Sequence, residues 1–268
     1  MCLILFATRA HADYPLIVAA NRDEAYARPA ANAASWSDHP DVFGGRDLEQ
    51  GGTWLGIALS GRFAAITNYR QRPRAAAAPR SRGEIARNFL CGSGDTPGYL
   101  ESIAQRKNDY RGYSLIAGTL DQLYFDSNRA ERMQPVSSGV HGLSNHLLDE
   151  PWPKVQRGIE LLGELLAADE QTLTRNLFKC LADRTPAPDT LLPDTGLGLE
   201  RERASSAAFI PGASYGTRAS TVILVSSNGG VLFCERTFGA HGVLLGEVEQ
   251  RFELRAPVTA SRRAAAGA

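Results

Sequence analysis

The sequence has 268 residues, and its 29 Lys plus Arg balance 29 Asp plus Glu, so the formal net charge is zero. A hydrophobic fraction of 43% is typical of a folded globular chain with a sizeable core. The balanced charge excludes an overall attraction to nucleic acid, and no stretch approaches the ~20 apolar residues of an integral membrane segment. The cysteines lack any paired metal spacing, which argues against a zinc site and favours a reducing, cytoplasmic location; they are Cys2, Cys91, Cys180 and Cys234.

Two short apolar runs open the chain. Residues 2–7 and 15–20 are rich in branched side chains and flank a polar turn, which predicts a hairpin buried on both faces. If Met1 is removed, as we expect with a small second residue, Cys2 gains a free α-amine. That amine can take the thiol proton near neutral pH, because the two groups titrate near ~8 and ~8.5. Cys2 is therefore a candidate nucleophile, the alternative being an ordinary small apolar residue near a start codon.

The second run ends in the polar quartet Asn21-Arg22-Asp23-Glu24. Since side chains alternate along a regular strand, Asn21 and Asp23 are expected on one face and Arg22 and Glu24 on the other. Only one of these pairs then faces Cys2, unless the chain bends. A plain polar loop after the strand is the alternative interpretation.

The next segment combines a predicted crossing with a hairpin. Residues 25–52 contain alanines, prolines and two glycine pairs, and we expect an irregular crossing between strands in preference to a ligand-binding loop. Residues 53–59 and 62–67 flank Ser60-Gly61, a strong two-residue hairpin signal. The second strand of this hairpin places Asn68 at its end.

An arginine-rich stretch follows the hairpin. It predicts a solvated loop, with an entry surface for an anionic ligand as the less favoured alternative. Ser81 and Glu84 have the spacing of a capping box and predict a helix that reaches Cys91. The arginines are Arg70, Arg72, Arg74, Arg80, Arg82 and Arg87.

The second half repeats the alternation of strands and paired helices. Apolar positions at three- and four-residue spacing predict amphipathic helices over 151–167 and 170–181. Paired helices between antiparallel hairpins predict an α+β fold, a four-layer αββα sandwich of two antiparallel sheets flanked by helices. We expect one domain over residues 1–257, a surface excursion over 184–216 and a disordered tail over 258–268. The other predicted elements are a helix over 96–107 and strands over 113–117, 122–125, 132–136, 139–143, 217–225 and 231–236.

Several motifs occur in order over nearly the whole chain: Cys2, Asn21–Glu24, Gly44–Asp47, Gly51–Gly56, Thr67–Tyr69, Gly142–Asn145 and Tyr215–Arg218. Together they resemble the NRDE family, that is, the transport and Golgi organisation protein 2 family. That family is assigned to the N-terminal nucleophile hydrolase superfamily. The resemblance therefore implies an αββα sandwich, the architecture that the order of elements predicts independently.

The resemblance also implies a catalytic site. The choloylglycine hydrolases and penicillin V acylases of the superfamily use an N-terminal Cys, an Arg and an Asp near the end of the second strand, two Asn and a later Arg. By this likeness Cys2 attacks an amide carbonyl, its amine shuttles the proton and Asp23 orients the amine. The implied catalytic residues are Cys2, Arg22, Asp23, Asn68, Asn145 and Arg218.

The remaining roles follow from the same resemblance. Asn68 or Asn145 would donate to the oxyanion, and Arg22 and Arg218 would set the field around the thiolate. One departure from the pattern is visible in the sequence. In those hydrolases two residues separate the Arg from the Asp, whereas Arg22 and Asp23 are adjacent here.

Two hypotheses from different classes remain open. The first is an N-terminal cysteine hydrolase of the non-peptide C–N bond of a small-molecule amide. The second is a non-catalytic cytosolic protein that binds and traffics haem or an acyl-CoA-like lipid in the same pocket, in keeping with the family's association with haem and lipid trafficking. Neither assigns a cofactor or metal; haem enters only as cargo, without assigned ligands among His39, His141 and His146. The sequence does not specify an oligomeric state.

Overall fold

The computed structural model describes residues 2–70 and 78–255, whose strands form two antiparallel sheets. Sheet A contains, in spatial order, β10 (Gly139–Leu143), β1 (Cys2–Thr8), β2 (Leu16–Ala25), β11 (Tyr215–Val225), β12 (Gly230–Phe238) and β13 (Leu244–Glu253). Sheet B contains, in chain order, β3 (Ala30–Ser35), β4 (Val42–Asp47), β5 (Leu55–Ala58), β6 (Phe63–Asn68), β7 (Tyr113–Gly118), β8 (Leu123–Ser127) and β9 (Gln134–Pro135).

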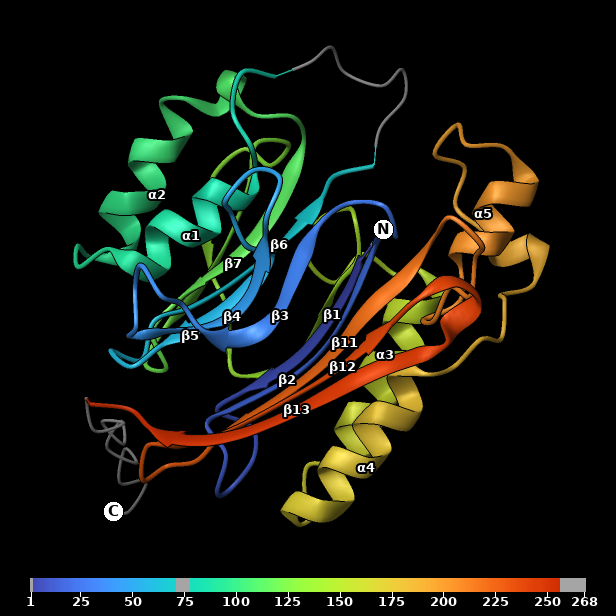
Figure 1. Ribbon diagram of the computed structural model, residues 1–268. Coiled ribbons are helices and arrows are strands. Elements are labelled where there is room, and N and C mark those ends of the chain that lie inside the picture. The colour runs from blue at the N-terminus through green and yellow to red at the C-terminus, as the bar shows by residue number, and fades with distance from the viewer. Residues whose placement is uncertain (1, 71–77, 256–268) are drawn as a thin grey trace, which may run out of the picture.

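Helices cover the outer faces of both sheets (Figure 1). α3 (Pro153–Glu164) and α4 (Glu170–Leu181) pack on sheet A, and α1 (Gly83–Cys91) packs on sheet B beside α2 (Thr96–Ala104). This confirms the predicted αββα sandwich. The other helical segments are α5 (Leu199–Ser205) and three 3₁₀ turns, η1 (Lys107–Asp109), η2 (Asp189–Leu191) and η3 (Ala240–Gly242).

Strand alternation in β1 and β2 divides the apolar core into layers. Ile4 and Phe6 point between the sheets, whereas Leu3 and Leu5 point toward α3 and α4. All four are at most 3% exposed, so the opening hairpin is buried on both faces, as predicted. β1 pairs with β10 on one side and with β2 on the other, and its first residue, Cys2, lies in register with Arg22 of β2.

The irregular crossing predicted for residues 25–52 is wrong, because this segment forms β3 and β4. Alanine and glycine have low strand propensity, but here the packing requires small residues. A Cβ on Gly44 would lie 2.6 Å from the Leu55 carbonyl oxygen of the neighbouring strand. No strand was predicted for β13 either; its alternating charges are typical of an edge strand.

The solvated loop predicted for the arginine-rich stretch is wrong at two of its members. Arg70 forms a 2.6 Å ion pair with Glu202 and lies over the Trp152 ring, and its side chain is 8% exposed. Arg82 is half-buried. Arg72 and Arg74 lie outside the described residues.

Two local predictions also need correction. The predicted capping box is absent at α1, where Glu84 accepts hydrogen bonds from Arg80 and Tyr110 instead. The predicted surface excursion over 184–216 contains α5, and its Glu202 is only 4% exposed. The tail predicted over 258–268 lies outside the described residues.

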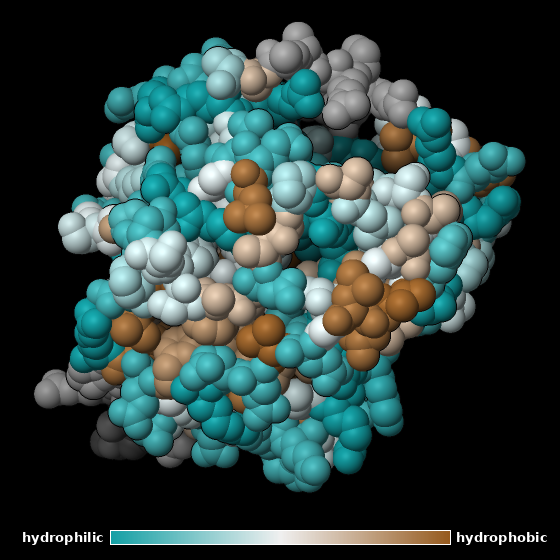
Figure 2. Space-filling view, viewed as in Figure 1, coloured by the Kyte–Doolittle hydropathy of each residue, from teal (hydrophilic) through white to brown (hydrophobic). Residues whose placement is uncertain are grey.

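The surface is mostly hydrophilic, with separate apolar clusters on the face shown in Figure 2. The most exposed apolar side chains include Leu48 and the consecutive residues Val243, Leu244 and Leu245 at the start of β13. In the described part of the chain, no helix is both long and apolar enough to cross a membrane.

A buried carboxyl group joins the two sheets. Glu235 of β12 is 1% exposed, and its Oε1 accepts a 2.7 Å hydrogen bond from the backbone N–H of Ala33 in β3. Its Oε2 accepts from the Thr221 hydroxyl at 3.2 Å. Burial raises the pKa of Glu235 from the ordinary value of 4.5 to about 7.

We therefore predict that Glu235 makes the free energy of unfolding fall as the pH rises from 4.5 to 7. In this window the unfolded chain has released the proton that the folded chain still holds, so ionisation favours unfolding. Relative to Glu235→Gln, the wild type should lose about 3 kcal/mol across the window, measured by urea denaturation at a series of pH values. The exposed Glu253→Gln serves as control, and parallel pH curves for wild type and Glu235→Gln would contradict the prediction.

Candidate active site

The side chain of Asn145 connects β1 of sheet A to the last residue of β6 in sheet B. Its Oδ1 accepts a 3.0 Å hydrogen bond from the Cys2 nitrogen, and its Nδ2 donates to the Asn68 carbonyl at 2.8 Å. Its own carbonyl accepts from the Arg70 N–H at 2.7 Å. The backbone of Asn145 is left-handed, with φ 58°, a conformation that asparagine tolerates better than most residues. This conformation directs a 1% exposed amide at Cys2.

Cys2 lies at a small cavity between the sheets. The neighbouring Ser144 hydroxyl donates to the Cys2 carbonyl at 2.8 Å, so both backbone polar groups of Cys2 are held. The cavity volume is about 110 Å³. Its lining residues come from β1, β2, β4 and β6, from the turn after β2, from the segment before β5 and from the residues around the start of α1. They are Cys2, Arg22, Asp23, Glu24, Arg28, Asp47, Thr53, Trp54, Ile66, Asn68, Ser81, Arg82 and Gly83.

Arg22 faces Cys2 across the β1–β2 ladder. The two residues are paired in register, and the Arg22 guanidinium carbon lies 4.0 Å from the centre of the Trp54 ring. Trp54 can occupy this place only because position 45 is glycine: a Cβ there would lie 2.2 Å from the indole ring. Burial lowers the pKa of Arg22, and the nearby Cys2 opposes this shift.

Asp23 follows the predicted alternation and faces the helices of sheet A. Its Oδ1 accepts a 2.7 Å hydrogen bond from the Thr217 hydroxyl, and burial raises its pKa while Lys154 and the Thr217 bond oppose the rise. Asp23 nevertheless lines the same cavity as Arg22. Since Cys2 pairs with Arg22, Asp23 lies one residue further along β2 than Cys2 in the ladder. Although Arg22 and Asp23 are adjacent and point to opposite faces of β2, both therefore lie at the end of the hairpin where Cys2 lies.

Of the other two predicted site residues, Asn68 lines the cavity and Arg218 does not. Asn68 lies at the end of β6 and is exposed. A bulge in β11 sends the Arg218 side chain to the carbonyls of Ala25 and Arg28, so it holds the turn from which Arg28 reaches the cavity wall.

Sequence reasoning missed Lys154 as a neighbour of the site. Lys154 lies in the first turn of α3, is 4% exposed, and its Nζ has no hydrogen-bond partner among the described residues. Burial lowers its pKa to about 8, while Asp23 and Cys2 pull the pKa upward and Arg70 lowers it. A lysine directly after Pro153 resembles an ordinary exposed residue of a helix start, so only the tertiary packing identifies it.

Arg82 was named in the sequence only as part of the solvated stretch. It lines the cavity and donates a 3.1 Å hydrogen bond to the Gly112 carbonyl. Its place depends on a glycine contact, since a Cβ on Gly52 would lie 2.5 Å from the carbonyl carbon of Gly83, the residue after Arg82. The glycine pair Gly51-Gly52 was the sequence signal that another part of the backbone packs closely against this segment.

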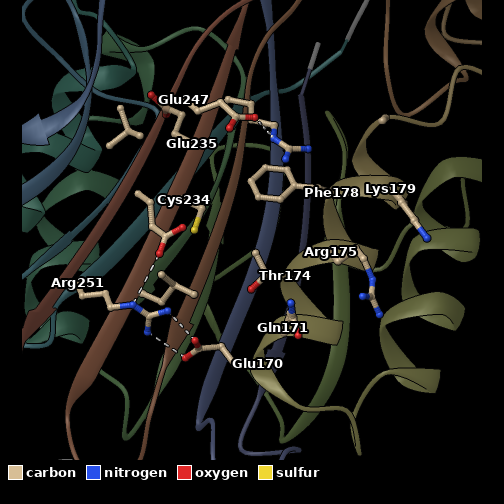
Figure 3. Close-up of a pocket in the computed structure, with 15 residues that line it drawn as sticks. Glu170, Gln171, Thr174, Arg175, Phe178, Lys179, Cys234, Glu235, Glu247 and Arg251 are labelled. Atoms are coloured by element: carbon tan, nitrogen blue, oxygen red, sulfur yellow. Dashed lines mark hydrogen bonds and ion pairs between the residues drawn. The ribbon is translucent and has the colours of Figure 1, made fainter.

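A larger groove of about 650 Å³ lies elsewhere, between α4 and strands β12 and β13 (Figure 3). Two of its arginines form ion pairs with acidic residues of the same groove. Arg251 pairs with Glu170 at 2.7 Å, and Arg236 pairs with Glu247 at 2.6 Å while lying over the Phe178 ring. None of the six residues that the sequence nominated lines this groove.

The fold and the site define an αββα protein with a cysteine at the start of a central strand. The family model described as Transport and Golgi organisation 2 matches residues 1–240, and the chain belongs to this family. It is 38% identical to the Transport and Golgi organization protein 2 homolog of Bos taurus over 90% of each chain. It is 37% identical to the Homo sapiens homolog over 84% of this chain and 87% of that one. Among solved structures, penicillin V acylase from Agrobacterium tumefaciens overlays with a TM-score of 0.47 and 10% identity, covering 95% of this chain and 86% of that one.

We predict that Asn145→Ala lowers the free energy of unfolding by roughly 3–5 kcal/mol, because it leaves buried polar groups unpaired and puts alanine in a left-handed conformation. Asn145→Gly should be about 1 kcal/mol more stable than Asn145→Ala, since glycine adopts that backbone without strain. Denaturant unfolding measures both values. The exposed Asn88→Ala on α1 is the control, and a wild-type stability for Asn145→Ala would refute the role given to this amide.

We also predict a pH dependence from Lys154. Its pKa falls from the ordinary 10.5 to about 8 in the folded chain, so between these values the unfolded chain binds the extra proton. The free energy of unfolding should therefore rise with pH across this window, by about 3 kcal/mol relative to Lys154→Met. Denaturant unfolding between pH 8 and 10.5 tests this, with the exposed Lys179→Met as control. A pH-independent difference between wild type and Lys154→Met would show that Lys154 is not buried as a charge.

Proposed function

We propose that this chain is an N-terminal cysteine hydrolase that cleaves the C–N bond of a small-molecule amide. The observation that supports it best is the hydrogen bond from the Cys2 nitrogen to Asn145, at the cavity that Cys2 itself lines. It means that the atom that becomes the α-amine after removal of Met1 has a fixed place beside the thiol. The family resemblance and the αββα fold support the same activity.

The proposed reaction has two halves. The Cys2 sulfur attacks the amide carbonyl as its proton passes to the α-amine, and the C–N bond then breaks while the ammonium returns a proton to the leaving amine. Water, activated by the same amine, attacks the resulting thioester. The acid is released and the Cys2 thiol is restored.

The proposal assigns supporting roles to three further residues. Asn145 uses its Oδ1 on the Cys2 nitrogen and an Nδ2 hydrogen on Asn68, so it holds the amine. Of the two asparagines, Asn68 is the better oxyanion donor because it is exposed and lines the cavity. In this proposal Asp23, one residue beyond Cys2 in the ladder, orients the α-amine.

The carrier hypothesis is less well supported. It requires haem or an acyl-CoA-like lipid in the pocket beside Cys2, whose volume is about 110 Å³. Pockets for drug-sized ligands are typically ~300–1,000 Å³. The four cysteines are free thiols, which accords with the proposed cytoplasmic location.

We predict that Cys2 is alkylated by iodoacetamide at pH 7 faster than the other three cysteines. Burial raises the pKa of Cys91, and it raises the pKa of Cys180 and of Cys234 to about 11, so these thiols are almost wholly protonated. Mass spectrometry of the labelled peptides gives the four rates, and intact mass establishes removal of Met1 in the same sample. Equal labelling of Cys2 and Cys91, or retention of Met1, would count against the hydrolase.

The same prediction extends to turnover. A panel of N-acyl amides should be hydrolysed by the wild type, whereas Cys2→Ser should lose at least about 100-fold in kcat/KM because the hydroxyl is a much weaker nucleophile. Cys91→Ser is the matched control and should retain activity. Circular dichroism verifies that each variant is folded, and an unchanged rate for Cys2→Ser would exclude Cys2 as the nucleophile.

A further inference from the structure

Two guanidinium groups beside Cys2 lack an acidic partner. Among residues 2–70 and 78–255, neither Arg22 nor Arg82 forms an ion pair with a carboxylate. The contrast with other arginines is clear: Arg28 pairs with Asp47 at 2.6 Å, and Arg70 pairs with Glu202 at the same distance. The arginines in the groove of Figure 3 that face acidic side chains, Arg236 and Arg251, are likewise paired.

Leaving cations unpaired in a partly dehydrated place is costly. Arg22 is 7% exposed, and burial lowers the pKa of Arg82 to about 10, with Arg111 adding repulsion. Cys2 and Glu24 oppose this shift. A negatively charged group bound in the cavity would stabilise the charged form of both guanidiniums.

The cavity wall carries three arginines, Arg22, Arg28 and Arg82, and three carboxylates, Asp23, Glu24 and Asp47. The charges of Arg28 and Asp47 cancel in their ion pair, and Asp23 faces the helices of sheet A, where Thr217 binds it. Glu24 is the remaining carboxylate on the wall, and its Oε1 accepts the Ala25 N–H at 2.9 Å. Glu24 opposes the lowering of the pKa of both Arg22 and Arg82, but it forms an ion pair with neither.

Both guanidiniums are held in place before any ligand arrives. Arg22 is fixed by the β1–β2 register and by the Trp54 ring, which rests where only Gly45 leaves room. Arg82 is fixed by its hydrogen bond to Gly112 and by the close contact of Gly52 with the residue that follows it. Such preorganisation lowers the entropy that binding costs.

We propose that Arg22 and Arg82 form a carboxylate-binding subsite beside Cys2, so that the amide substrate bears a carboxylate near its scissile bond. Guanidiniums bind carboxylates through paired hydrogen bonds, and neither of these two forms an ion pair with a carboxylate of the described residues. A cavity of about 110 Å³ suits such a small group and leaves the remainder of the substrate outside. The link to a substrate rests on the proposed function; the subsite itself is tested without turnover.

The test compares alkylation of Cys2 by iodoacetate and by the neutral iodoacetamide, using the full chain at low ionic strength. The rate ratio is divided by the same ratio for N-acetylcysteine amide, a thiol without a carboxylate. We expect a normalised ratio of about three to ten, falling toward one as salt is added. A ratio of one or less would overturn the subsite, and so would failure of both reagents to reach Cys2.

Variants identify the residues responsible. Arg82→Met should return the normalised ratio toward one, and Glu24→Gln should raise it because the competing carboxylate charge is removed. Arg80→Met is the control, since Arg80 is more exposed and already paired with Glu84. Because Glu24→Gln predicts a gain, misfolding cannot imitate it. No response to either Arg82→Met or Glu24→Gln would overturn the assignment.

A protection experiment distinguishes the anions. Acetate should slow the reaction of Cys2 with iodoacetamide at lower concentration than inorganic phosphate does, and stronger protection by phosphate would overturn the carboxylate assignment. The outcome is separable from the proposed function. A high iodoacetate ratio without amide hydrolysis removes the hydrolase and keeps the subsite, whereas hydrolysis with a ratio of one removes the subsite alone.

Discussion

The hydrogen bonds of Asn145 are the constraint on which the site depends. Cys2 begins a strand of sheet A, Asn68 ends a strand of sheet B, and a single buried amide contacts both. The cavity between the sheets therefore has a defined width at this point. Because Asn145 has a left-handed backbone, the connection requires a residue that combines this conformation with a donor and an acceptor, and asparagine meets both demands.

Charge burial organises the two faces of β2. On the inter-sheet face Arg22 lies over Trp54, and on the helix face Asp23 lies with Lys154. Burial shifts the pKa of each group toward its neutral form, and the charges of its neighbours oppose this shift. The charge of each group is therefore stabilised by several neighbours and not by one partner. Lys154 responds to the charges of Asp23 and Arg70, and Arg70 in turn forms an ion pair with Glu202.

The fold could be predicted from periodicity where apolar residues dominate. The double-sided burial of β1 and β2 and the stripes of α3 and α4 are visible in the sequence, and they determine the layer order. The alanines and glycines of β3 and β4 indicate an irregular loop because their strand conformation follows from close packing against β5 and not from propensity.

The candidate site could likewise be predicted only in part. Resemblance and position bring Cys2, Arg22 and Asp23 together, since all three belong to one hairpin. Arg82 and Lys154 could not be found in this way, because a charged residue in a loop or at a helix start is usually solvated. Their burial is produced by segments distant in sequence, such as the contact of Gly52 with Gly83.

The ion pair between Glu202 and Arg70 has a consequence for how this chain tolerates change. Surface excursions normally accept substitutions and altered lengths freely, because few contacts tie them to the core. The segment around α5 differs, since Glu202 anchors it to an arginine that in turn acts on Asp23 and Lys154. Leu191 and Leu199 in this segment are exposed, so substitutions there should cost little stability. The number of residues that bring Glu202 to Arg70 is constrained, because a change of length would break this ion pair.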